Sequence, residues 1–170
     1  IQTRLGQSLL TQPAQSLQIG DTFVVWEVGH DIVAYDLRTG QHVWLAQTAA
    51  RELYPSTSGT WVTWEVQPAP SESYVLALDV DAGGSPIEVP PVGEVHHNPT
   101  IDGDNIVFDA LVSDGLGGTD FDVYLYNIPT AQLYPIATGD GDQKLSDVYG
   151  DQVAYVHSTD LESDIRVVTF

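Results

Sequence analysis

The sequence predicts a single all-β domain in which one unit of short strands is repeated four times. A glycine-containing turn followed by a β-branched and aromatic strand recurs four times along the chain. No long segment has apolar residues at the spacings of an amphipathic helix. With 170 residues, of which 42% are hydrophobic, the chain is large enough to bury one core.

The second strand of each repeat is expected to start directly after a turn glycine. These glycines are Gly20, Gly59, Gly103 and Gly150, which are 39, 44 and 47 positions apart. Each strand carries a large aromatic residue near its end, at Trp26, Trp64, Phe108 and Tyr155. The spacing matches a β-propeller blade of about 40–50 residues, and the matching aromatic positions predict packing between successive blades rather than a sugar-binding platform.

Three further strands complete the predicted unit. The innermost strands are expected to open at Ser16, Pro55, Pro99 and Ser146. Third strands follow at Asp31–Leu37, Ser73–Val80, Asp122–Ile128 and Asp164–Phe170. Outer strands are expected at His42–Ala46, Ile87–Val89 and Leu133–Ile136. The single domain 1–170 thus divides into repeats at approximately 12–46, 53–89, 97–136 and 144–170.

The last repeat has no outer strand of its own after Phe170. The segment Ile1–Leu5 has strand character, and Leu5 lies 11 residues before Ser16, close to the gaps between the other outer strands and the next inner strands. We therefore predict a small four-bladed β-propeller whose ring is closed by Ile1–Leu5. Such closure removes open strand edges, which otherwise template aggregation.

Several segments resemble the TolB-like propeller repeats of bacterial and archaeal secreted proteins. They are the run Pro99–Phe108, the strand Asp31–Leu37 with Arg38-Thr39-Gly40, the strand Asp122–Ile128 and the turn Gly139–Gln143. The resemblance covers nearly the whole chain. It implies the fold and little about function, since propellers host unrelated activities. Propellers of this family usually have more than four blades, so the chain is either a compact ring or part of a larger assembly.

Charge and composition exclude several partners. The chain has 5 Lys and Arg against 24 Asp and Glu, a formal net charge of -19, which argues against nucleic-acid binding. No apolar run approaches the ~20 residues of a membrane span. Cysteine and methionine are both absent, which favours an oxidising location: extracellular, cell-surface or periplasmic. Because position 1 is not Met, we expect a processed product, an excised domain or a sequence assigned without its start.

One loop is a candidate calcium site. Calcium takes six to eight oxygen ligands, and the loop from Asp114 to Asp122 is rich in Gly and Asp. Asp114, Asp120 and Asp122 are the candidate ligands. No glutamate closes the loop as in an EF-hand, so a flexible turn without metal is the other interpretation, and it is the one we favour.

The run His96-His97-Asn98 is the candidate binding site, because it precedes an inner strand near the expected central channel. Adjacent side chains of an extended chain point to opposite faces, so the two histidines are not expected to share one ion. Three acidic residues, Glu27, Glu65 and Asp109, each follow the aromatic residue of a second strand. We interpret them as solvent-facing strand ends rather than as a ring of cation ligands.

These observations favour a secreted, non-catalytic propeller that binds a protein or glycan partner. No serine-hydrolase elbow, phosphate loop or dinucleotide motif occurs. A self-assembling subunit of an extracellular filament or surface layer, with strands exchanged between copies, is the alternative. A polysaccharide-active enzyme with paired carboxylates in the channel is the third.

Overall fold

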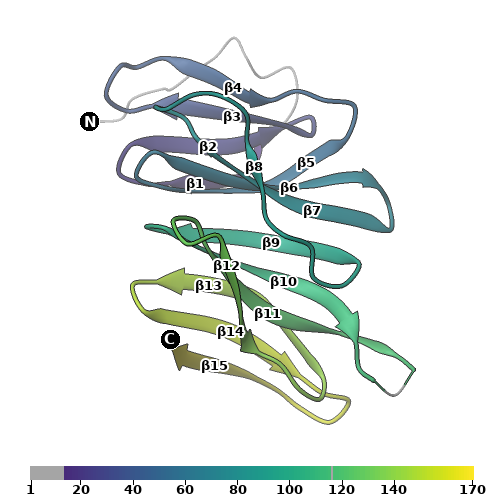
Figure 1. The fold of residues 1–170 in the computed structure, drawn as a ribbon. Coiled ribbons are helices and arrows are strands. Elements are labelled where there is room, and N and C mark those ends of the chain that lie inside the picture. The colour runs from purple at the N-terminus through teal and green to yellow at the C-terminus, as the bar shows by residue number, and fades with distance from the viewer. Residues whose placement is uncertain (1–13, 116) are drawn as a thin grey trace.

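The computed structural model describes residues 14–115 and 117–170, which form fifteen β-strands and no helix (Figure 1). This confirms the predicted all-β class. Hydrogen bonds link the strands into sheets of four, eight and three strands. In the eight-stranded sheet, a single parallel bridge between Ser73 and Val95 joins two antiparallel halves. The strands therefore fall into four groups that follow the order of the chain.

The bounds of the third and outer strands of each group lie close to those predicted. The first group contains β1 (Ala14–Ile19), β2 (Phe23–Val28), β3 (Asp31–Asp36) and β4 (His42–Ala46). The second contains β5 (Arg51–Ser58), β6 (Trp61–Ala69), β7 (Glu72–Asp79) and β8 (Ile87–Glu88). The third contains β9 (Val95–Asp102), β10 (Asn105–Ser113), β11 (Thr119–Asn127) and β12 (Gln132–Ala137). The fourth contains β13 (Asp142–Tyr149), β14 (Gln152–Ser158) and β15 (Ser163–Thr169).

The four groups stack in chain order, and the first and fourth lie at opposite ends of the stack (Figure 1). Among the described strands, β15 pairs with β14 alone. The predicted closing strand Ile1–Leu5 lies outside the described residues. Closure of the ring and the count of four blades therefore stay predictions.

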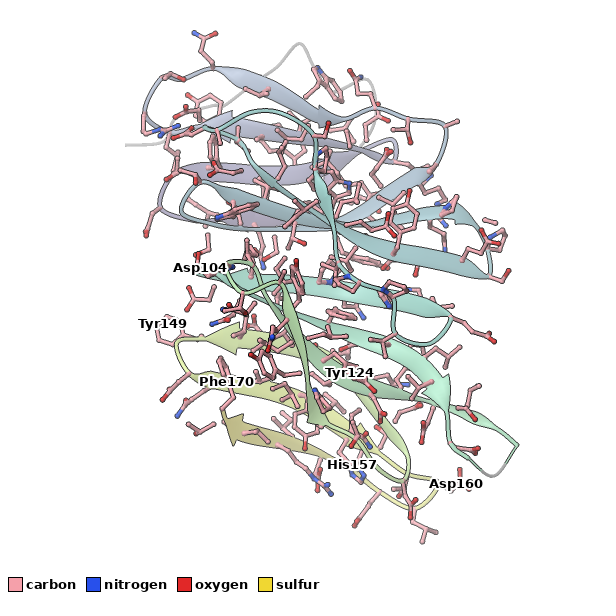
Figure 2. The ribbon with its side chains drawn as sticks, viewed as in Figure 1. Asp104, Tyr124, Tyr149, His157, Asp160 and Phe170 are labelled. Atoms are coloured by element: carbon pink, nitrogen blue, oxygen red, sulfur yellow. The ribbon has the colours of Figure 1, made fainter. Side chains whose placement is uncertain are left out.

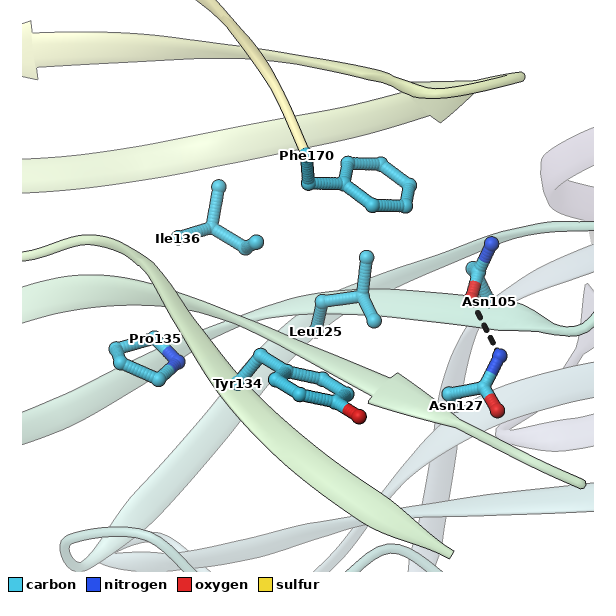
Figure 3. Close-up of a pocket in the computed structure, with 7 residues that line it drawn as sticks. All are labelled: Asn105, Leu125, Asn127, Tyr134, Pro135, Ile136 and Phe170. Atoms are coloured by element: carbon cyan, nitrogen blue, oxygen red, sulfur yellow. Dashed lines mark hydrogen bonds between the residues drawn. The ribbon is translucent and has the colours of Figure 1, made fainter. Parts of the chain in front are cut away.

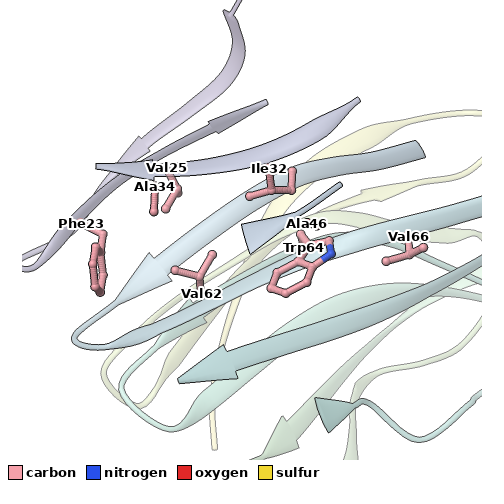
Figure 4. Packing of buried hydrophobic residues seen from close by; sticks show 8 residues of the cluster. All are labelled: Phe23, Val25, Ile32, Ala34, Ala46, Val62, Trp64 and Val66. Carbon is pink, nitrogen blue, oxygen red and sulfur yellow. The ribbon is translucent and has the colours of Figure 1, made fainter. Parts of the chain in front are cut away.

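Hydrophobic cores fill the spaces between successive groups. Figure 4 shows the first of them, where Val62, Trp64 and Val66 of β6 approach the first group. The facing side chains of the first group are Phe23, Val25, Ile32, Ala34 and Ala46. Phe108 and Tyr155 occupy the position of Trp64 in the next two cores. All three aromatic residues are buried, which confirms their predicted role in packing between repeats.

Each innermost strand contains a β-bulge at the same place. Two of its residues lie opposite the single aromatic residue of the second strand, and the register of the ladder shifts there. The first bulge residue has a positive φ in every group: 48° at Ser16, 50° at Tyr54, 51° at Asn98 and 56° at Leu145. The predicted strand openings at Ser16, Pro55, Pro99 and Ser146 were therefore wrong, because these residues sit within bulges in the middle of their strands.

The innermost strands of successive groups are joined by repeated side-chain hydrogen bonds. The Ser58 hydroxyl accepts a bond of 2.9 Å from the amide of Gly103. The Asp102 carboxylate accepts one of 2.7 Å from the amide of Gly150, which holds the same place in the next group. These bonds keep the inner strands adjacent, so that residues of different groups can form one site.

Candidate functional site

The innermost strands of the first three groups together line a groove of about 270 Å³. Its residues come from the bulges and the positions beside them: Ser16, Gln18, Tyr54, Pro55, Asn98, Pro99 and Thr100. Non-glycine residues with positive φ are uncommon and cluster at functional sites, because the strain persists only where neighbouring structure enforces it. Three such residues meet in this groove.

The surface of the groove is mainly apolar. Tyr54 is 46% exposed although it belongs to a strand that is otherwise largely buried. Pro55 and Pro99 add rigid apolar surface. The Thr100 hydroxyl is buried and has no hydrogen-bond partner among the described residues. An exposed aromatic ring and two prolines suit an extended peptide better than a small charged molecule.

Only one residue of the predicted run 96–98 lines this groove. Asn98 does so, and its amide nitrogen donates to Asp109 over 2.9 Å. His96 is buried, where Ser73 binds its backbone and its ring nitrogen Nε2 lies 2.9 Å from the Val92 amide. Burial lowers the pKa of His96, so its ring is held neutral. His96 is thus positioned as a packing residue.

His97 contacts the preceding group instead. Its Nδ1 lies 2.9 Å from the Glu65 carboxylate, which raises the pKa of His97 above that of an ordinary histidine. The two histidines therefore have different partners, although they are adjacent in the sequence. Sequence reasoning had no means to find Glu65 as the partner, because 32 residues separate the pair.

The three carboxylates that follow the aromatic residues are buried, which corrects their assignment to solvent. Glu27, Glu65 and Asp109 are 4%, 1% and 0% exposed. Asp109 binds the bulge amides of the following group, whereas Glu65 lies beside His97 and Glu27 lies 3.4 Å from His30. These residues are buried because the following group covers the face of the sheet on which each of them lies.

The Asp109 carboxylate binds the bulge of the fourth group. It accepts hydrogen bonds from the amides of Leu145 and Ser146 at 2.8 and 3.2 Å, and from the Ser146 hydroxyl at 2.7 Å. Burial still raises the pKa of Asp109, while these bonds and that from Asn98 oppose the rise. The carboxylate therefore fastens the bulge of the fourth group to the third.

The candidate calcium loop contributes to an acidic pocket of about 450 Å³. Asp114 and Asp120 line it together with Asp140, Asp142 and Asp160. Asp122 is not among the lining residues, and it is buried. Among the described residues, no group of three or more carboxylate or imidazole side chains has the arrangement of a metal site. The structure thus unites two of the three candidate ligands, and calcium binding stays the alternative to the turn without metal.

The charges in this pocket repel one another. Burial, followed by the charges of Asp114 and Asp142, raises the pKa of Asp120. Lys144 lies 2.7 Å from Asp142 and lowers the pKa of that carboxyl. Figure 2 shows His157 and Asp160 at this end of the fourth group, with Tyr149 at the opposite end. The acidic pocket therefore belongs to one rim of the molecule.

A larger and more apolar cavity of about 610 Å³ lies between the third group and the last residue (Figure 3). Phe170 covers Leu125 and Ile136, while Tyr134 and Pro135 form its outer wall. A hydrogen bond of 2.8 Å between Asn127 and Asn105 closes one end. This cavity lies beside the group that has three strands instead of four.

No family model and no curated protein matches the chain. Solved structures do match it. TolB from Acinetobacter baumannii aligns with 93% of this chain and 41% of its own, at 15% identity and a TM-score of 0.67. The β-propeller domain of the Trilobed protease from Pyrococcus furiosus aligns with 89% of this chain and 48% of its own, at 14% identity and a TM-score of 0.66.

This chain has a TolB-like β-propeller fold. The resemblance inferred from the repeats is thereby confirmed. A puromycin-hydrolyzing peptidase from Mycobacterium tuberculosis also matches, over 93% of this chain and 27% of its own, at 14% identity and a TM-score of 0.65. At such identities the likeness shows the fold alone. The TolB-like propeller described here spans less than half the length of each of these three chains.

The described part of this TolB-like propeller contains no helix with the length and hydrophobicity that crossing a membrane would require.

Proposed function

We propose that this chain is a non-catalytic interaction module that binds an extended peptide segment of a protein partner in the groove of its inner strands. The observation that carries the proposal is the meeting of Tyr54, Asn98 and Thr100 in one groove. Three separate strand groups contribute to it, so the site depends on the folded stack rather than on one loop.

The partner segment is expected to be basic. The chain carries a formal net charge of -19, which attracts cationic partners over distances of about a Debye length, roughly 8 Å at physiological salt. Tyr54 offers a ring face for a cationic or apolar side chain. The same acidity, with no cysteine or methionine in the chain, supports an extracellular, cell-surface or periplasmic location.

The test is selection of short basic peptides from a random library on the immobilised chain, followed by affinity measurement. Tyr54→Asn removes the ring and keeps a residue that tolerates positive φ, and we expect at least tenfold weaker binding. Tyr134→Asn is the matched control, since Tyr134 is 43% exposed but belongs to an outer strand. Failure to select any peptide, or equal binding by the Tyr54 variant, would contradict the proposal.

A further inference from the structure

Two successive residues of β9 are held by buried carboxylates of different strand groups. His97 Nδ1 lies 2.9 Å from the Glu65 carboxylate of the second group. The amide nitrogen of Asn98 donates to the Asp109 carboxylate of the third group over 2.9 Å. Asn98 lines the groove of the inner strands, so one peptide unit separates a titratable side chain from the wall of the candidate site.

Asn98 depends on these contacts because of its backbone conformation. Its φ of 51° lies in the left-handed region, which a non-glycine residue keeps only where neighbouring structure enforces it. Pro99 follows, and a proline favours extended backbone at the residue before it. If the hold on His97 and Asn98 weakens, we therefore expect Asn98 to relax toward an extended conformation and the groove to lose its shape.

The contact between His97 and Glu65 is largely shielded from water. The Glu65 side chain is 1% exposed, and its second oxygen, Oε2, has no hydrogen-bond partner among the described residues. The His97 side chain is 28% exposed, so it can exchange a proton with solvent. A buried carboxylate is stabilised far more by a positively charged partner than by a neutral one. Glu65 therefore holds His97 most firmly when the imidazole ring is protonated.

Two charges act on His97. Glu65 of β6 has the larger effect, and Asp109 of β10, opposite His97 in the ladder, adds a smaller attraction. Together they raise the pKa of His97 against the effect of its burial. On β9 itself, His96 is kept neutral by burial. The strands β5 and β7 also pack against β9, but none of their described side chains adds to the charge acting on His97.

The strand β13 also packs against β9, and it presents a cation that is already neutralised. Lys144 lies 2.7 Å from Asp142, and its Nζ is 5.7 Å from the centre of the Phe121 ring. The same ring lies 5.7 Å from the His97 ring, measured between centres. On this side the histidine thus meets an aromatic ring and not a free cation, so Glu65 decides whether His97 carries a proton near neutral pH.

We propose that protonation of His97 controls the affinity of the groove for its peptide, and that the protonated form is the one that binds. This regulation rests on the peptide binding proposed above. While His97 is charged, its contact with Glu65 keeps the Asn98 wall of the groove in place. When His97 is neutral, only a fraction of the molecules has the groove formed, and the apparent dissociation constant rises by that fraction. Because coupling is reciprocal, a bound peptide raises the proton affinity of His97.

The effect has the opposite sign to that of the overall charge. Affinity should be highest below the ordinary histidine pKa, about 6.5, and should fall as pH rises through the raised pKa of His97. Loss of protons also makes a chain of net charge -19 more negative, which attracts a basic peptide more strongly. The regulation therefore predicts weaker binding at high pH, whereas overall charge alone predicts tighter binding.

Calorimetry with a basic peptide whose binding depends on Tyr54 tests the proposal. Between about pH 5.5 and about pH 8.5 we expect the affinity to fall at least about fivefold. Buffers of different ionisation enthalpy should show proton uptake on binding at intermediate pH. His97→Gln should bind weakly at every pH, whereas His97→Lys, which stays charged over this range, should bind at high pH as tightly as the unchanged chain binds at low pH.

A second histidine beside a buried carboxylate supplies the matched control. His30 Nδ1 lies 3.4 Å from Glu27, but His30 does not line the groove. His30 has a φ of 78°, which asparagine tolerates. His30→Asn should therefore keep both the affinity and its dependence on pH. Loss of the pH dependence in this variant would assign the effect to another histidine and overturn the proposal.

The chain without peptide gives an independent measurement by nuclear magnetic resonance. The backbone amide signals of Tyr54 and Thr100 should shift with pH at the midpoint of the His97 ring, and Glu65→Gln should lower that midpoint. Groove signals that do not follow His97, or an affinity that rises with pH, overturn the regulation and leave peptide binding intact. If no peptide is selected, the proposed function fails, and these signals alone decide whether His97 controls the shape of the groove.

Discussion

At Asp109 one carboxylate receives four hydrogen bonds from two strand groups. Residues of this kind are costly to bury and costly to remove, because truncation leaves their donors without partners. The bond to Leu145 matters most, since Leu145 adopts a positive φ that an isolated strand would not keep. The carboxylate and the strained bulge therefore depend on each other.

Replacing Asp109 should destabilise the chain strongly. We expect Asp109→Ala to lower the free energy of unfolding by about 3 kcal/mol or more, and Asp109→Asn by less, since an amide retains one acceptor. Urea unfolding at pH 7 measures both. Asp104→Ala, in an exposed turn, is the control and should change stability by less than about 0.5 kcal/mol. Equal effects of Asp104→Ala and Asp109→Ala would show that the bulge is not held by this side chain.

The pair of His97 and Glu65 should make stability depend on pH. The folded-state pKa of His97 lies above its ordinary value because of Glu65. The stabilising contribution is therefore complete below the ordinary histidine pKa, about 6.5, and is lost as pH rises through the raised value. We expect a loss on the order of 1 kcal/mol across this window. Urea unfolding of His97→Gln, measured across the same pH range, should not show this loss of stability. If the variant keeps the pH dependence of the unchanged chain, the pair of His97 and Glu65 is not its cause.

At the scale of single elements, three hairpin turns each contain a glycine with the same backbone conformation. Gly59, Gly103 and Gly150 have φ of 56°, 55° and 61°, and a Cβ at any of them would meet nothing within 4 Å. Each begins a two-residue loop, in which a glycine with positive φ matches the twist of the flanking strands. The glycines are thus required by backbone conformation and not by space.

Alanine at such a turn should destabilise the folded chain only through backbone strain. Gly103→Ala should lower the free energy of unfolding by about 1–2 kcal/mol, and Gly103→Asn by less, since asparagine tolerates this conformation. Thermal or urea unfolding distinguishes the two variants. A neutral alanine variant would mean that the turn adopts another conformation at no cost.

The predicted closing strand is also tested at this scale. Deleting the first six residues should expose the edge of β15 and cause aggregation or a large loss of stability, because an unpaired edge templates further pairing. Light scattering and the melting temperature report both effects. A truncated chain that stays unaggregated with an unchanged melting temperature would remove Ile1–Leu5 from that edge.

The strands and the cores could be predicted because their signals are local. Turn glycines, β-branched runs and the aromatic positions all lie within one repeat, and they located β4 with its exact bounds at His42–Ala46. The groove could not be predicted, since it depends on bulges whose shape is enforced by another repeat. The partner of Asp109 lies 36 residues away, and no pattern within a repeat distinguishes its buried carboxylate from an exposed one.

At the scale of the whole molecule, acidic residues far outnumber basic ones, 24 against 5. Several of the acidic residues lie together in the pocket around Asp120. Screening should stabilise the chain, so NaCl should raise the melting temperature. At equal ionic strength we expect CaCl2 to add nothing, which is the outcome if the Asp114–Asp122 loop holds no metal. Asp120→Asn should raise the melting temperature at low salt, because it removes a repelled charge. A calcium-specific increase that Asp120→Asn abolishes would instead establish the site.

Among the described residues, the extensive contacts between strand groups join only neighbours in the chain: the first group with the second, the second with the third, and the third with the fourth. A molecule built in this way resembles a short linear polymer, in which each unit is held by the units on either side. The two middle groups have two such neighbours, whereas each terminal group has only one among the described residues. Local unfolding should therefore begin at the first and fourth groups and proceed toward the middle of the chain. Amide protons in β6 and β10 should then be the last to exchange with solvent.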